Sequence, residues 1–169
     1  MSPRRPRNPG PGRTLLHIVT LSRVDWAVLV CSLLLLPLVS AGLRLVGLRR
    51  VLALIAAIPR PFRGAAEDNP RGATRVASLV EVAALGVWPR PTCLAKAIVA
   101  SSLLRRRGRA AQLVVGVTKA RGPLEAHAWV ELEGAALGAP PGGASYAVLA
   151  RIADRLPSRA RIGRHERAP

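Results

Sequence analysis

Residues 92–108, TCLAKAIVASSLLRRRG, decide the fold, because they predict a long helix that begins at a cysteine. Thr92 is a good N-cap residue, which places Cys93 in the first helical turn. Three arginines fill the predicted last turn, where cations suit the helix dipole, and Gly108 supplies the stop. One face of the predicted helix is apolar and carries Leu94, Ala97, Ile98 and Leu104.

A cysteine at this position is suited to nucleophilic chemistry. Unpaired backbone N–H groups and the positive end of the dipole favour negative charge on sulfur and on the oxyanion of an acyl-transfer intermediate. The alternative is that Cys93 is inert and fills a small hole. Cys31 lies inside an apolar run, so the two cysteines do not indicate a disulfide framework, and a reducing compartment fits better.

Residues 125–133, EAHAWVELE, predict a β-strand because polar and apolar residues alternate. One predicted face is apolar and carries Ala126, Ala128, Val130 and Leu132; the other carries His127, Trp129, Glu131 and Glu133. A cysteine at a helix start that faces a histidine on a strand is the nucleophile–base arrangement of thiol hydrolases, in which an acid orients the imidazole. The alternative is a surface histidine without a partner.

The rest of the chain predicts helices first and strands afterwards, which favours an α+β domain. Residues 26–43 carry no charge and fit a membrane helix, a signal-peptide core or a buried helix; we favour a buried or membrane-surface helix. We expect an amphipathic helix over 43–58, a helix over 74–85, strands over 110–118 and 135–138, and a strand or short helix over 145–152.

The formal net charge is +17 at pH 7, and almost all the basic residues are arginines. This charge attracts polyanions, anionic membranes and acidic proteins, or belongs to a solvated surface without a specific partner. Aromatic residues that stack on bases make up only 3% of the chain, so we expect no nucleic-acid partner. The scattered histidines and the lack of a CxxC pair lead us to expect no metal and no cofactor.

Several sequence blocks, in order, resemble the lasso-peptide leader peptidases, also named for the processing protein of microcin-type lasso peptides. The blocks are Cys93-Leu94, Leu103 to Gly108, Leu113 to Val117, Gly122-Pro123, Ala126 to Glu131, and Tyr146 to Ile152. The resemblance spans about residues 24–153. It implies a transglutaminase-like (papain-like) core, in which the helix that carries Cys93 packs on a small antiparallel sheet, with apolar helices before it.

The resemblance also implies a function. Cys93 would attack the peptide bond that joins leader to core in a ribosomally made precursor, with His127 as base, and a separate ATP-using macrolactam cyclase would then close the core. Some relatives carry a leader-recognition domain. We find no matching segment here, so we expect the stand-alone peptidase half, acting with a separate recognition protein in the cytoplasm, with membrane association left open.

The expected organisation has four parts: a disordered basic tail (1–23), an apolar helical segment (24–58), the peptidase core (59–153) and a basic C-terminal tail (154–169). The sequence departs from the family at one point. The family pattern has an Asp about a dozen residues after the histidine, whereas residues 135–140 of this chain contain no carboxylate. Glu131 is the expected substitute, although residues four apart on a strand lie about 13 Å apart. Glu133, Asp154 and a Cys–His dyad are the alternatives.

Two other functions compete with the peptidase. The missing Asp motivates a catalytically impaired scaffold of the same fold, which binds precursor or cyclase. The net charge and the apolar run at 26–43 motivate a basic membrane-peripheral protein.

Overall fold

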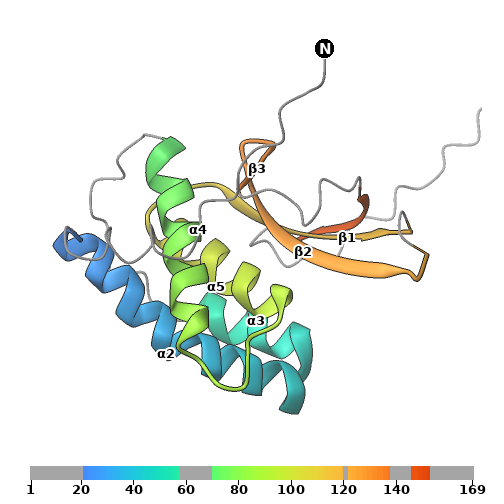
Figure 1. Ribbon diagram of the computed structural model, residues 1–169, viewed down its shortest axis with the longest axis horizontal. Coiled ribbons are helices and arrows are strands. Elements are labelled where there is room, and N and C mark those ends of the chain that lie inside the picture. The colour runs from blue at the N-terminus through green and yellow to red at the C-terminus, as the bar shows by residue number, and fades with distance from the viewer. Residues whose placement is uncertain (1–20, 58–69, 120–121, 138–145, 153–169) are drawn as a thin grey trace, which may run out of the picture.

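The computed structural model describes residues 21–57, 70–119, 122–137 and 146–152. Within these residues, helices precede a sheet, as predicted (Figure 1). The helices are α2 (Arg23–Leu45), α3 (Gly47–Ala57), α4 (Pro70–Leu85) and α5 (Cys93–Arg106), and the strands are β1 (Ala111–Thr118), β2 (Glu125–Leu132), β3 (Ala135–Leu137) and β4 (Ala147–Ile152). The tails expected over 1–23 and 154–169, with Asp154, lie almost wholly outside the described residues.

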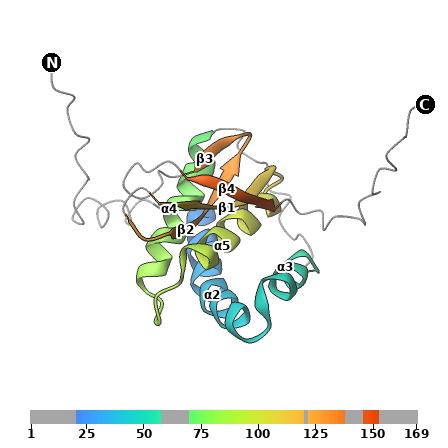
Figure 2. The same cartoon turned by 90° about the vertical axis from the view of Figure 1, so that its right-hand side faces the viewer.

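The four strands form one antiparallel sheet in the order β3-β2-β1-β4, with the helices on one side of it (Figure 2). In the central pair, Gly116 of β1 lies opposite His127 of β2. The strand predicted over 125–133 ends one residue early, at Leu132. Glu133 and Gly134 form the turn into β3 with φ of 53° and 82°, because a two-residue hairpin of this type needs positive φ at both positions.

Helix α5 occupies the centre of the molecule, in contact with α2, α4, β1 and β2. It is buried on almost every side from Ala95 onward, and its buried residues are Ala95 and Ala97 to Leu104. Two of these are serines, and their hydroxyls donate to the carbonyls of Ile98 and Val99 within the same helix, at 3.0 and 2.8 Å. The polar groups are therefore satisfied locally, and the helix needs no solvent on any side.

Helix α2 packs on α4 and α5 through one narrow face, which contains Val28, Ser32, Leu36 and Val39. An ion pair fixes its first turn: Arg75 of α4 donates to Asp25 at 2.9 Å, and this hydrogen bond lowers the pKa of the Asp25 carboxyl. Among the described helices, only α2 is long and apolar enough to cross a membrane, yet one side of it belongs to the protein core.

The amphipathic helix predicted over 43–58 begins later, at Gly47. The chain turns between α2 and α3 at Gly47, whose φ of 81° suits a residue without a side chain. Gly42 then allows the two helices to approach closely, because a Cβ there would lie 2.9 Å from a methyl group of Val51.

We predict that Leu36→Ala lowers the free energy of unfolding by about 2–5 kcal/mol, because Leu36 is fully buried (0% exposed) and its removal leaves a cavity. Leu38→Ala on the same helix is the matched control: this side chain is 67% exposed, and the expected change is within about 0.5 kcal/mol. Urea denaturation without lipid measures both. Equal effects of the two changes would contradict the packing of α2.

Candidate active site

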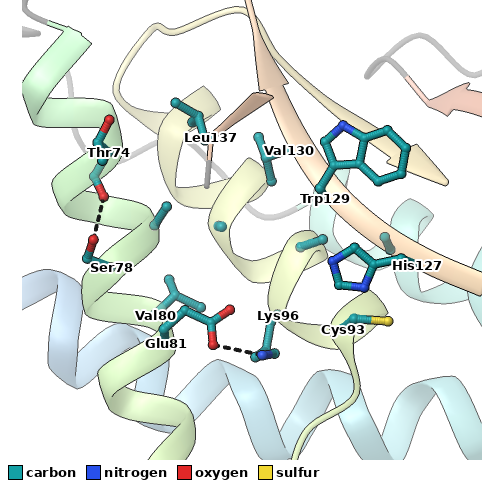
Figure 3. Close-up of a pocket in the computed structure, with 14 residues that line it drawn as sticks. Thr74, Ser78, Val80, Glu81, Cys93, Lys96, His127, Trp129, Val130 and Leu137 are labelled. Atoms are coloured by element: carbon teal, nitrogen blue, oxygen red, sulfur yellow. Dashed lines mark hydrogen bonds and ion pairs between the residues drawn. The ribbon is translucent and has the colours of Figure 1, made fainter. Parts of the chain in front are cut away.

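A pocket of about 250 Å³ lies where α4, α5, β2 and β3 meet (Figure 3). Its polar lining residues are Thr74, Ser78, Glu81, Cys93, Lys96 and His127; the others are Ala77, Val80, Ala97, Ala100, Ala128, Trp129, Val130 and Leu137. Cys93 and His127, which are 34 positions apart in the chain, therefore share one pocket. In Figure 3 the thiol of Cys93 lies beside the His127 imidazole.

The N-terminus of α5 places Cys93 at the pocket. Thr92 caps the helix as predicted, because its hydroxyl accepts from the amide of Ala95 at 3.2 Å. The Thr92 carbonyl accepts from the amide of Lys96 at 3.1 Å. Within the described residues, the amides of Cys93 and Leu94 donate to no protein group, so the first two N–H groups of the helix are available beside the sulfur.

His127 stands near the start of β2, half-buried. Burial lowers the pKa of its imidazole, because the surroundings disfavour the charged form; the nearby Lys96 ammonium lowers the pKa further, while Glu81 raises it. The net effect favours the neutral form of the imidazole. A neutral imidazole can accept a proton, as a general base must.

Lys96 and Glu81 pair across the pocket at 2.7 Å (Figure 3). Lys96 follows Cys93 by three residues and therefore lies on the same face of α5, whereas Glu81 comes from α4. The pair ties α4 to the helix that carries the cysteine. It also places a cation and an anion within electrostatic reach of His127.

The buried carboxylate of Glu131 is bound to residues other than His127. One oxygen accepts from the Trp129 indole N–H at 3.2 Å, and the other accepts from Nε of Arg151 at 3.1 Å. Within the described residues, no carboxylate accepts a hydrogen bond from His127. Glu133, one alternative acid, pairs instead with Arg109 at 3.5 Å.

Aromatic rings surround His127 on its own face of the sheet. The ring of Trp129 is nearly parallel to the imidazole, at 15° and a centroid distance of 6.3 Å, and Tyr146 lies 5.7 Å away. Gly116 makes room for the indole, because a Cβ there would lie 2.8 Å from Cη2 of Trp129. Glu131 therefore fixes a ring that in turn stacks on the histidine.

Sequence reasoning did not select Lys96, Glu81, Trp129 or Tyr146 as site residues. Lys96 could have been found from the sequence, since its spacing of three from Cys93 places both residues on one helix face. Glu81 could not have been found from the sequence, because its contact with Lys96 depends on how α4 packs on α5. The other cysteine, Cys31, lies half-buried on α2 and does not line the pocket. Among the described residues, no group of histidine, cysteine and carboxylate side chains could hold a metal ion.

A family model described as the Transglutaminase-like superfamily matches residues 35–151. The chain belongs to this superfamily. Its fold is typical of cysteine proteases and transglutaminases, and the α+β architecture predicted from the sequence is confirmed. The match begins inside α2, so the family domain includes the second half of α2 and all of α3. No curated protein and no solved structure matches the chain.

We predict that the pKa of His127 lies below the ordinary histidine value and responds to its two charged neighbours with opposite signs. Lys96→Met removes a cation and should raise the pKa; Glu81→Gln removes an anion and should lower it further. NMR titration of the imidazole resonances measures all three proteins, with a His127→Gln variant to assign the signal. A shift of the same sign in both variants would contradict this electrostatic arrangement.

Proposed function

We propose that this protein is a cysteine peptidase with Cys93 as nucleophile and His127 as general base. The observation that carries the proposal is the meeting of a helix-start cysteine and a strand histidine in one pocket. Membership of a superfamily that includes cysteine peptidases supports it. The lowered pKa of His127 supports it too, because a base must be unprotonated before it can act.

The reaction then runs in two halves. His127 takes the thiol proton while Sγ of Cys93 attacks the carbonyl carbon of the peptide bond, and the free amides of Cys93 and Leu94 donate to the developing oxyanion. The imidazolium gives its proton to the leaving amine, which departs and leaves a thioester. His127 next removes a proton from water, the hydroxide attacks the thioester, and the carboxylic acid and the thiol are released.

As the substrate we propose the precursor of a lasso peptide. The ordered blocks from Cys93 to Ile152 that resemble leader peptidases support this choice. Cleavage at the junction would release the core with a free amine, while the leader remains on Cys93 until water attacks. A separate recognition protein would deliver the leader, and a macrolactam cyclase would use the new amine.

Glu131 enters this proposal as a positioning residue. Its carboxylate accepts a hydrogen bond from the Trp129 indole, and the indole stacks on His127. Glu131 therefore orients the imidazole indirectly, through the indole ring. Arg151 neutralises the carboxylate from the other side. This relay replaces a direct contact between acid and histidine, and it takes the place of the Asp that the family pattern supplies.

We predict that Cys93→Ala abolishes cleavage of the precursor, because the thiolate is the attacking group. The measurement is mass spectrometry of leader and core after incubation with a lasso-peptide precursor and a separate recognition protein. Cys31→Ala is the matched control and should cleave normally, since Cys31 lies outside the pocket. Unchanged processing by Cys93→Ala would sink the assignment.

A second measurement separates the enzyme from a scaffold of the same fold. The scaffold is favoured by the observation that no carboxylate of the described residues binds His127. Iodoacetamide should alkylate Cys93 faster than Cys31 at pH 6–7, and His127→Ala should remove the difference, because the imidazole takes up the thiol proton. Equal alkylation of the two cysteines in the unaltered protein would favour the scaffold.

We predict that Glu131→Leu lowers kcat by roughly 10–100-fold with little change in KM, because a displaced imidazole no longer meets the sulfur well. Glu131→Gln should retain more activity than Glu131→Leu, since its amide oxygen can still accept from the indole, although its NH2 group then faces the Arg151 donor. Rates are expressed per reactive Cys93 thiol, so that misfolded protein does not count. Equal losses in both variants would show that the negative charge matters and would contradict the relay.

A further inference from the structure

Helix α2 is apolar on two opposite sides, and the described protein covers one of them. The covered side contributes Leu36 and its neighbours to the core. The other side is open to solvent and carries Trp26, Val30, Leu33, Leu34, Leu38 and Leu45. Positions two apart lie about 200° apart around a helix, so Leu38 points almost directly away from the buried Leu36.

The open side is long and uninterrupted. It extends about 28 Å from Trp26 to Leu45, and the chain carries no charge from Trp26 to Leu43. Leu34 and Leu38, near its middle, are 63% and 67% exposed. A contiguous apolar surface of this kind marks a site of interaction with another molecule.

The charges around the open side indicate which kind of molecule binds there. Arg23 stands at one end of α2; Arg44 stands at the other, followed by Arg49 and Arg50 on α3, and all four are exposed. Trp26, an amphipathic ring, lies one turn inside the first end. An apolar helix side with basic residues at its ends and a tryptophan near one of them suits the interface of an anionic bilayer. The net charge of +17 also favours binding to an anionic bilayer.

We propose that the open side of α2 docks on an anionic membrane surface, with the helix axis parallel to the bilayer. A spanning orientation is disfavoured, because it would remove Leu36 from the core and break the Asp25–Arg75 ion pair. A second copy of this chain is disfavoured too. In an antiparallel pair Arg23 would meet Arg44 of the other copy, and in a parallel pair Arg23 would meet Arg23.

Docking would leave the pocket open. No residue of α2 lines the pocket, and α2 lies on the side of the molecule away from the sheet (Figure 2). The proposal therefore does not rest on the peptidase activity, and its test can fail without affecting that activity.

The test is co-sedimentation of the full chain with phosphatidylglycerol-containing vesicles, compared with pure phosphatidylcholine. We expect binding to the anionic vesicles that weakens as salt rises. The double variant Leu34→Glu/Leu38→Glu should lower the partition coefficient roughly tenfold or more, because it places charge in the apolar side. The control, Leu124→Glu/Leu149→Glu, makes the same charge change at exposed leucines of the sheet side and should retain binding.

Four outcomes would overturn the proposal. The first is that the unaltered chain does not bind anionic vesicles. The second is that the Leu34/Leu38 variant binds as well as the unaltered chain, so that basic residues alone account for the binding. The third is that both double variants lose binding equally. The fourth is a dimer in analytical ultracentrifugation that the Leu34/Leu38 variant dissociates, with no vesicle binding. Unchanged cleavage or alkylation by the Leu34/Leu38 variant shows that its pocket is intact.

Discussion

The burial of α5 among two helices and two strands is the constraint on which the site depends. A helix that is enclosed from Ala95 to Leu104 cannot rotate or slide without opening gaps in a close-packed interior. Its alanines and serines let α2, α4 and the sheet approach closely. The first turn, which carries Cys93, is therefore held in one place at the end of the packed segment, where β2 presents His127.

Most of the fold follows from local patterns in the sequence. The apolar spacing after Thr92, the alternation around His127 and the turn at Gly134 each specify their element through nearest neighbours along the chain. The start of α3 was predicted too early, because apolar spacing continues through the bend and only the backbone conformation of Gly47 reveals it. The two-sided character of α2 was also hidden, since both of its sides are apolar.

The site was predictable in part. The chemistry of Cys93 and His127 suggested a pair, and the structure brings them into one pocket. The connection of Glu131 to Trp129 was not visible, because a strand places residues two apart on one face without saying which polar atoms meet. It depends on Gly116, whose missing side chain makes space on the neighbouring strand for the indole. Such a contact is set by register between strands, and no local pattern reports register.

The cap at Thr92 has a consequence for how the protein can change. An aspartate there would hold the helix start as well as threonine does and would interact favourably with the dipole. It would also bring a full negative charge next to a sulfur that must itself become negative. A hydroxyl satisfies the Ala95 amide without that repulsion. A neutral cap at this position therefore stabilises the start of the helix without opposing the negative charge on sulfur.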